Sequence, residues 1–368
     1  MQPDWLKQHF AAQTTSESEA PTAPEQSSGM NRRNFLHSGM FAGATAGLAA
    51  GGLGLVAQHH AAHAQPVQAA SPFGKEWWPS AWGPADERGA ANRITPAKIL
   101  EAVNLIKTGK IYQLGRMYEH GMPLFGSRHY SLTIPGGPTG GPFGTAKLMY
   151  NDEMVSGEIG QVGTQFDGLG HVGTLIGNEV VYYNGLKQSE VGGAYGLQKL
   201  GVHNVGVFFT RGILLDVLAY KGGDRVPIGY VITPEDVQGT LTRQGIQEPG
   251  EGDVVLFHTG HGKLWMKDNA EYNKGSPGPG VTVAKWLIDQ KICLVGGDTW
   301  PVEAVPGEDK DRPFECHQWW ITMSGIYIHE NLDLAQLAAD RVYEFAYIFS
   351  PLRLKGATGS PGNPIAVA

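Results

Sequence analysis

Short apolar runs recur along the chain after residue 65, with glycine and proline in many of the segments between them. Such runs of β-branched and aromatic residues are typical of buried strands. The pattern therefore predicts a core built largely of short strands rather than a helical bundle. We expect strands over residues 111–114, 205–209, 212–217, 253–258, 292–297 and 325–328.

Helical patterns lie between these runs. Thr95-Pro96 and Thr233-Pro234 are typical of a helix cap followed by the first helical residue. We expect helices over 94–108, from Thr233, over 281–290 and from Asp333. The third of these lies between two apolar strands, which predicts a βαβ-like unit. With no internal repeat and no linker, residues 65–368 are expected to form a single α/β domain.

Composition narrows the possible functions. Charged residues are only 17% of the 368 residues, below the usual ~25%, and there are 52 glycines, which predicts many tight turns. The formal net charge is −7 and no block of Lys or Arg occurs, which argues against a nucleic-acid partner. A stretch with Pro-Gly-Gly and Gly-Gly-Pro, residues 131–144, is expected to be a loop that covers a site.

The first 64 residues resemble a leader that is removed. Arg32-Arg33 precede a weakly apolar run rich in Gly and Ala, and small residues before Ala64 are typical of a cleavage site. This order resembles a twin-arginine export signal and predicts a periplasmic protein. An uncleaved anchor is the rival interpretation, but the Gly and Ala content does not favour a stable membrane span. Residues 1–29 are polar, and Met30 is an alternative start.

The chain has two cysteines, Cys293 and Cys316, too few for a disulfide framework. Cys293 lies in an apolar run and is expected to be a buried strand residue. A bridge between the two is the alternative in an exported protein.

The most informative segment is residues 160–174, which read GQVGTQFDGLGHVGT. Gln161, Gln165 and Asp167 are separated by even steps, so on an extended strand their side chains leave one face. His171 follows past a glycine turn. Three oxygen donors and an imidazole suit a divalent metal. The alternative is a polar strand edge in a glycine-rich loop.

Other polar residues follow the predicted strands. His258, Asp298 and Glu330 come at or just after the ends of apolar runs, and His317 lies just before the last strand. Strand ends at one edge of a sheet are a usual place for a site. These residues extend the candidate set.

Several blocks together resemble the cyclase family of metal-dependent hydrolases, which includes kynurenine formamidase and isatin hydrolase. The family signature H-x-G-T-H-x-D-x-x-x-H stands here as Q-V-G-T-Q-F-D-G-L-G-H over residues 161–171. Blocks at 82–96, 210–217, 252–260, 295–303 and 325–334 also match. The resemblance implies a mixed β/β/α fold of the swivelling type and a homo-oligomer.

By position, the resemblance implies two ligand sets that share Asp167. The first set is Gln161, Gln165 and Asp167, and the second is Asp167, His171, His317 and Glu330. Glutamines replace the two histidines of the signature, so the second set is expected to fill first, with Zn²⁺ or Mn²⁺. The Q-x-x-x-Q-x-D variant also resembles trans-dienelactone hydrolases.

The resemblance implies hydrolysis of a cyclic amide or an N-formyl aryl amide by water that the metal activates. His171 or Glu330 is expected to move the proton. Trp300 and His258 are the candidate pocket residues, and His261 is a further histidine with a surface or core role as its alternative. Two other functions stay open: a lactone hydrolase, and an inactive periplasmic protein that binds a metal or ligand.

Overall fold

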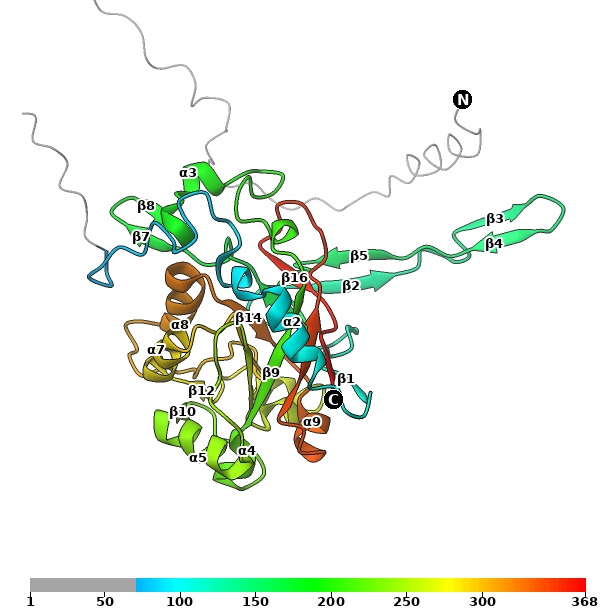
Figure 1. Cartoon of the computed structure of the whole chain (residues 1–368). Helices are drawn as coiled ribbons and strands as arrows, with labels where there is room; N and C mark the ends of the chain where they lie inside the picture. The colour runs from blue at the N-terminus through cyan, green and yellow to red at the C-terminus, as the bar shows by residue number, and fades with distance from the viewer. Residues whose placement is uncertain (1–70) are drawn as a thin grey trace, which may run out of the picture. The chain divides into compact units, whose positions relative to one another are not determined.

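A nine-stranded mixed sheet forms the centre of the computed structural model, which describes residues 71–368 (Figure 1). The four central strands β9, β11, β13 and β14 are parallel, and antiparallel strands flank them on both sides. The order across the sheet is β1 (Ile111–Gln113), β17 (Ile365–Val367), β15 (Glu344–Phe349), β9 (Phe208–Asp216), β11 (Val254–His258), β13 (Leu294–Gly297), β14 (Tyr327–Glu330), β6 (Gln165–Asp167) and β16 (Gly359–Pro361). The predicted α/β class is confirmed.

The sheet is strongly curled. Strands β16 and β17 lie near opposite ends of the strand order, yet only residues 362–364 connect them. Because a residue spans at most about 3.6 Å, this link is short and the two edges of the sheet must approach each other. The curl brings β6 and β14, which carry the candidate ligands, into the body of the domain.

The predicted strands are confirmed except at one place. Residues 205–209 and 212–217 were expected to form two strands, but they contribute to one continuous strand, β9. Gly212 lies within this strand and does not interrupt it. A Cβ at this position would meet the ring of Phe345 on the neighbouring strand β15. Gly212 thus serves close packing of the ring rather than a turn.

The helices are short. They are α2 (Pro96–Val103), α3 (Gln188–Val191), α4 (Val217–Lys221), α5 (Pro234–Gln244), α6 (Asn269–Tyr272), α7 (Val281–Asp289), α8 (Glu315–His317) and α9 (Ala335–Ala339), with 3₁₀ turns at Gly89–Arg93, Tyr183–Gly185, Val202–Asn204 and His261–Leu264 and a π-turn at Gln318–Thr322. The Thr233 hydroxyl accepts from the Asp236 N–H, as the predicted cap requires. The predicted βαβ unit is confirmed, since α7 connects the parallel neighbours β11 and β13.

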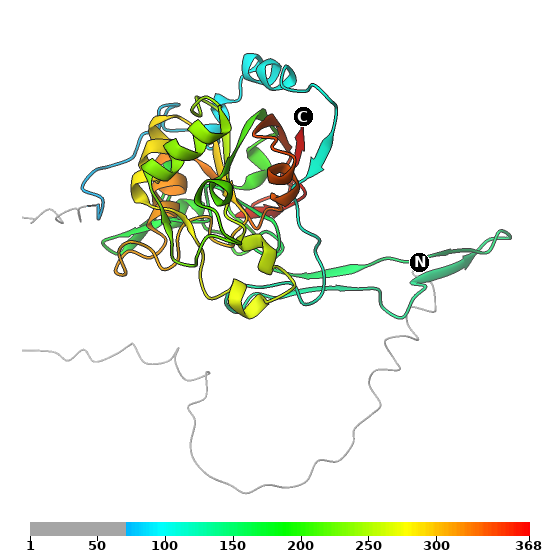
Figure 2. The same ribbon diagram turned by 90° about the horizontal axis from the view of Figure 1, so that it is seen from below.

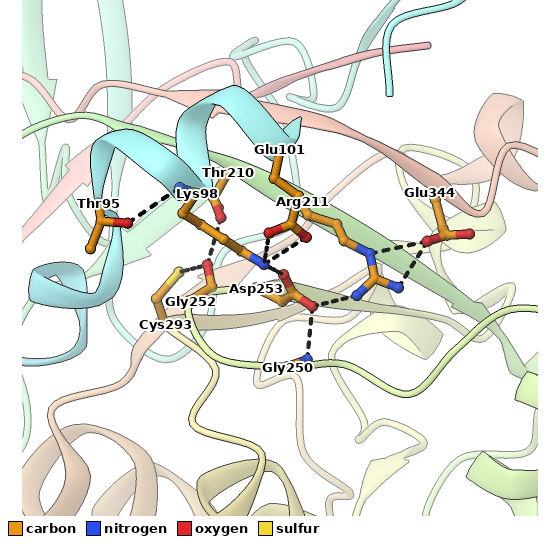
Figure 3. Close-up of polar contacts among 10 residues, drawn as sticks. All are labelled: Thr95, Lys98, Glu101, Thr210, Arg211, Gly250, Gly252, Asp253, Cys293 and Glu344. Atoms are coloured by element: carbon orange, nitrogen blue, oxygen red, sulfur yellow. Dashed lines mark hydrogen bonds and ion pairs between the residues drawn. The ribbon is translucent and has the colours of Figure 1, made fainter. Parts of the chain in front are cut away.

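A network of buried charges fixes α2 on the sheet (Figure 3). Asp253, just before β11, is fully buried and pairs with Lys98 of α2 at 2.5 Å and with Arg211 of β9 at 2.8 Å. Arg211 also donates to Glu344 of β15. Lys98 contacts Glu101 one turn along the same helix. One helix and three strands are therefore connected by ion pairs at a single point.

Four strands of the remaining structure form an arm that extends from the body (Figures 1 and 2). β2 (Tyr130–Thr133) pairs with β5 (Met154–Gly157), and β3 (Gly140–Phe143) pairs with β4 (Leu148–Tyr150) beyond them. The prediction that residues 131–144 form a covering loop is wrong. The segment pairs with its own continuation and points away from the domain. Two further small ladders are β7 (Thr174–Ile176) with β8 (Glu179–Val181), and β10 (Val231–Ile232) with β12 (Gly278–Pro279).

Cys293 and Cys316 are both buried and free, so the bridge considered for them is not formed. Within residues 71–368, no helix has the length and apolar character that crossing a bilayer requires. The leader, the twin-arginine pattern and the predicted start of the domain at residue 65 lie outside the described residues.

Candidate metal centre

Strands β6 and β14 bring the first candidate ligands together. They are antiparallel, with Gln165 opposite Glu330 and Asp167 opposite Ile328. Because side chains alternate along a strand, Gln165, Asp167 and Glu330 share one face, while Phe166 and His329 lie on the other. Phe166 stacks on Tyr327 and is fully buried, which anchors the register of the pair in the core.

Helix α8 supplies the imidazole. The Glu303 carboxylate accepts hydrogen bonds from the backbone N–H groups of Cys316 and His317 and contacts the His317 Nδ1 at 2.5 Å. Nδ1–H donation to Glu303 leaves Nε2 as the nitrogen that faces the centre. The Glu303 carboxylate thus orients the helix start and the ring together.

Asp167, His317 and Glu330 form the core of the cluster, and all three are buried. One ligand atom from each lies within 4.8 Å of the others. The His317 Nε2 lies 3.2 Å from Glu330 Oε1 and 3.9 Å from Asp167 Oδ2. His171 lies at the edge, with its Nε2 3.9 Å from Asp167 Oδ1. The structure therefore brings together all four residues of the second ligand set.

The two glutamines reach the same cluster by different routes. Gln165 begins β6, and its amide nitrogen donates to Glu330. Gln161 was expected on the same strand but precedes it in a bend, because Gly163 has a φ of 61° and interrupts the extended backbone. Its amide nitrogen nevertheless donates to Asp167 Oδ1 at 3.1 Å. The expectation of one straight strand is wrong, although both amides face the cluster.

The members of the cluster shift one another's pKa values. Burial, together with the charge of Asp167, raises the pKa of Glu330 above its ordinary value, and His317 acts in the opposite direction. Burial would lower the pKa of His317, but its hydrogen bonds to Glu303 and Glu330 raise it. Burial lowers the pKa of His171, with Asp167 opposing. Two buried carboxylates thus lie close together and need positive charge.

These residues fit a divalent metal. Asp167 Oδ2 and Gln161 Oε1 are buried without a hydrogen-bond partner among the described residues. Buried polar atoms are normally satisfied, so unpartnered oxygens in a carboxylate–histidine cluster suit a cation. A mixed set of carboxylate oxygens and imidazole nitrogens suits Zn²⁺ or Mn²⁺.

The cluster opens into a cavity of about 280 Å³. Gln165, His171, His317 and Glu330 lie on its wall, which aromatic side chains also line. Trp300 stacks on Phe125 with ring centres 4.2 Å apart, and both line the cavity with Phe314 and Arg128. The candidate pocket residue Trp300 is thus placed beside the cluster.

His258 lies elsewhere. It ends β11 and contacts Asp216, at the end of the neighbouring strand β9, with Nδ1 2.7 Å from Oδ1. It does not line the cavity. His261 is fully buried, and its Nε2 contacts the backbone oxygen of Tyr272. Asp298 accepts backbone N–H groups of residues 259, 260 and 262 and so shapes the loop after β11.

Three residues of the site were not predicted from the sequence: Glu303, Phe125 and Arg128. Glu303 closes the block 295–303 that carries the family resemblance, and this position was the available signal. Phe125 and Arg128 lie in a glycine-containing loop before the arm, where nothing in the spacing indicates a pocket.

The curled mixed sheet makes this an α/β protein. Its buried carboxylate–histidine cluster is a candidate metal site, and the aromatic cavity beside it is a candidate pocket for a small molecule. The sequence matches the family model Cyclase, described as "Putative cyclase", over residues 112–304. A solved structure described as a novel cyclase is 33% identical, with a TM-score of 0.69, and the match covers 78% of this chain and 96% of that one. The chain belongs to the cyclase family of metal-dependent hydrolases.

More distant solved structures share the fold. Isatin hydrolase A from Labrenzia aggregata, bound to benzyl benzoate, is 22% identical with a TM-score of 0.50, over 70% of this chain and 93% of that one. An isatin hydrolase bound to the product analogue thioisatinate is 18% identical with a TM-score of 0.50, over 74% and 95%. No curated protein sequence matches the chain.

Proposed function

We propose that the protein is a metal-dependent hydrolase that opens a cyclic amide or removes an N-formyl group from an aryl amide. The observation that carries this proposal is the buried cluster of Asp167, His317 and Glu330, of which His317 and Glu330 line an aromatic cavity. The cavity gives a flat, mostly apolar substrate a place beside the cluster. The solved isatin hydrolases share the fold, which supports this substrate class.

Asp167, His317 and Glu330 would hold the metal, with His171 at its edge. A bound Zn²⁺ or Mn²⁺ would supply a water of lowered pKa and polarise the carbonyl of the substrate. Glu303 keeps the His317 Nε2 directed toward the cluster. His171 is partly exposed to the cavity, and its lowered pKa keeps its ring neutral at pH 7, so it can accept a proton and pass it to the leaving nitrogen.

Arg128 supports a reaction that forms a carboxylate. It lies on the cavity wall and stacks over the Phe125 ring at 5.8 Å, and within residues 71–368 it has no ion-pair partner. Opening a cyclic amide with water produces a carboxylate and an amine. A guanidinium on the wall of this cavity suits that carboxylate.

The test is turnover by protein that is stripped with a chelator and reloaded with Zn²⁺ or Mn²⁺. We expect hydrolysis of isatin or of an N-formyl aryl amide. Turnover of a dienelactone alone would instead identify the lactone hydrolase suggested by the Gln-x-x-x-Gln-x-Asp variant. No turnover of any of the three, with metal bound, would favour a protein that only binds a metal or ligand.

A second measurement tests the site itself. Asp167→Ala and Glu330→Ala should abolish bound metal, measured by elemental analysis of the purified protein. Asp333→Ala, which removes a half-exposed carboxylate in the segment after β14, is the matched control and should keep its metal. Unchanged metal content in Asp167→Ala would contradict the assignment.

We propose export to the periplasm by the twin-arginine route, supported by Arg32-Arg33 and the weakly apolar run that follows. Replacing both arginines by lysine should leave the precursor in the cytoplasm of a bacterial host. Periplasmic mature protein from that variant would contradict this route.

We also propose that the chain forms a homo-oligomer through the arm of β2–β5. The arm exposes apolar side chains along its length, more than a monomer usually presents in one segment. They are Leu132, Ile134, Phe143, Leu148, Met149, Tyr150, Met154 and Val155. Phe143→Asp with Leu148→Asp should reduce the mass measured by light scattering, whereas Leu100→Asp on exposed α2 should not. A monomeric wild-type protein would overturn this proposal.

A further inference from the structure

Gln318 lines the cavity but belongs neither to the cluster nor to the aromatic side chains around it. It directly follows His317 and begins the π-turn Gln318–Thr322. Turns of this kind are rare and occur frequently at functional sites. The next residue, Trp319, packs on Phe73 with ring centres 5.3 Å apart. His317 and Gln318 are the two residues of α8 and the π-turn that line the cavity.

Two hydrogen bonds fasten this turn to the segment that carries His171. The Gln318 Nε2 donates to the Thr174 Oγ1 at 3.0 Å, and the Thr322 Oγ1 donates to the backbone oxygen of Val172 at 2.9 Å. Both threonines are buried. Because a buried hydroxyl holds its nitrogen, the Gln318 amide has a fixed direction before any substrate binds.

The oxygen of the same amide has no partner. Gln318 is partly exposed, and its Oε1 accepts no hydrogen bond within residues 71–368. It is not one of the buried polar atoms without a partner in this part of the chain, so it stays accessible. An amide can donate through its nitrogen and accept through its oxygen at the same time. Gln318 therefore offers a directed acceptor to a molecule in the cavity.

The other polar side chains on the cavity wall offer no comparable acceptor. Arg128 only donates hydrogen bonds. Gln165 donates to Glu330, and the residues of the cluster would hold the metal. His171 would move the proton. The Gln318 oxygen is therefore the neutral acceptor that remains for the substrate.

An amide and an ester differ at the atom beside the carbonyl group. The amide N–H is a donor that the Gln318 oxygen can accept, whereas the ring oxygen of a lactone has no hydrogen to donate. When the C–N bond breaks, its electron pair stays on the nitrogen, which takes up a proton. A nitrogen that gains positive charge is a stronger donor, so this hydrogen bond strengthens as the bond breaks and lowers the barrier.

We infer that Gln318 is a specificity-determining residue: its Oε1 accepts the N–H of the substrate and so favours an amide over the corresponding ester or lactone. The inference rests on the proposed metal-dependent function and specifies how the site recognises its substrate. Removal of this acceptor should slow substrates that carry an N–H and leave their analogues without one nearly unchanged.

The experiment compares kcat/KM within matched pairs of substrates, using the metal-loaded enzyme. N-formylaniline is paired with phenyl formate, and isatin with N-methylisatin, so that one member of each pair lacks the N–H. Gln318→Met keeps the length of the side chain and removes both its donor and its acceptor. We expect it to lower kcat/KM for the N–H member about five- to tenfold, as for the loss of one hydrogen bond between neutral groups, and to change the other member less than about twofold.

The ratio within a pair separates recognition from structure. A structural role for Gln318, or donation by its nitrogen to the substrate carbonyl, would lower kcat/KM equally for both members, and that result would overturn the inference. Unchanged values for both members would overturn it as well. If the metal-loaded wild type hydrolyses neither N-formylaniline nor isatin, the proposed function fails instead.

The partner of the Gln318 nitrogen gives an independent test. Thr174→Val removes the hydroxyl that directs the amide and should lose part of the preference for N–H substrates, while Thr174→Ser keeps the hydroxyl and should retain the preference. Gln198→Met, at an exposed position outside the cavity, is the control and should match the wild type. Metal content is measured for every variant, so that rates are expressed per bound ion. A full N–H preference in Thr174→Val would overturn the inference that a directed Gln318 amide selects the substrate.

Discussion

Gln165 lies directly opposite Glu330 on adjacent antiparallel strands, and its amide nitrogen donates to the Glu330 carboxylate. Gln165→Glu keeps the shape but places a third carboxylate in the cluster. Like charges at directly opposed positions destabilise a strand pair, and an uncompensated buried charge costs about 3 kcal/mol or more. We expect the metal-free variant to unfold at a lower temperature than the wild type, and added Mn²⁺ to raise its melting temperature by more than it raises that of the wild type.

The pH dependence of this variant has a definite sign. The crowded carboxyl pair has a folded pKa above the unfolded value of about 4.3, so it destabilises the fold increasingly as the pH rises above that value. The loss of stability of the metal-free variant relative to the metal-free wild type should therefore be small near pH 4 and large at pH 8. Gln198→Glu on the exposed surface should show no such trend. A deficit that is equal at both pH values would show that the Glu330 contact is not its cause.

Glu303 orients His317, so Glu303→Gln is expected to weaken metal binding without removing a ligand. The two oxygens of Glu303 now accept hydrogen bonds from the His317 Nδ1 and from two backbone N–H groups. The glutamine amide keeps one of these acceptor oxygens and loses the other, together with the negative charge. Loss of such an orienting carboxylate costs about 10- to 100-fold in metal affinity. Competition with a chelator measures it. Glu308→Gln, whose carboxylate accepts a hydrogen bond from the Val281 N–H, is the control and should bind metal as the wild type does.

Much of the fold follows from local patterns, because each strand of the parallel core is an apolar run that tertiary packing only extends or joins. Thr233 could be identified as a helix cap because its hydroxyl satisfies a backbone N–H within its own turn. The arm could not be predicted in this way. Its residues 131–144 contain the proline and glycine of a loop, and only their pairing with residues 148–157 makes them strands.

The site was predicted less completely, since its contacts join distant segments. The spacing of Gln165 and Asp167 correctly indicates one strand face, but Gln161 reaches Asp167 through a bend that the positive φ of Gly163 creates. Glu303 acts on His317 across an irregular segment, and no local periodicity connects the two. His258 also comes at the end of an apolar strand, as Glu330 does. Its side chain contacts Asp216, however, and does not line the cavity.

Arg128 is expected to bind the carboxylate of the product. Arg128→Met removes the charge while it retains much of the apolar length of the side chain. A hydrogen bond to a charged group is worth about 1.5–3 kcal/mol, so inhibition by a ring-opened product or its analogue should weaken about tenfold or more. Inhibition constants measured with the metal-loaded enzyme test this. Arg353→Met on the exposed surface is the control, and an unchanged inhibition constant in Arg128→Met would exclude the role.

His258 is expected to stabilise the fold, not to bind substrate. Burial would lower its pKa, but the hydrogen bond that its ring donates to Asp216 and the charge of Asp298 raise it. A raised folded pKa gives stability that is complete below the unfolded value of about 6.5 and is lost as the pH rises through the folded value. His258→Gln should therefore be less stable than the wild type by about 1–3 kcal/mol at pH 6, and the gap should narrow toward pH 9. Urea unfolding at both pH values measures the gap, and metal content should not change.

Asp253 connects Lys98 of α2 to Arg211 of β9, and its loss is expected to destabilise the domain far from the metal centre (Figure 3). Asp253→Asn leaves Lys98 and Arg211 facing each other without the carboxylate that separates them. Removing one member of a buried charge network costs about 3–5 kcal/mol. Urea unfolding should show that loss, and metal content per folded chain should stay the same. Glu101→Gln, which removes only the exposed carboxylate beside Lys98, should cost less than about 1 kcal/mol, because an exposed ion pair contributes little. If the two variants were equally stable, the buried network would not be what holds α2 on the sheet.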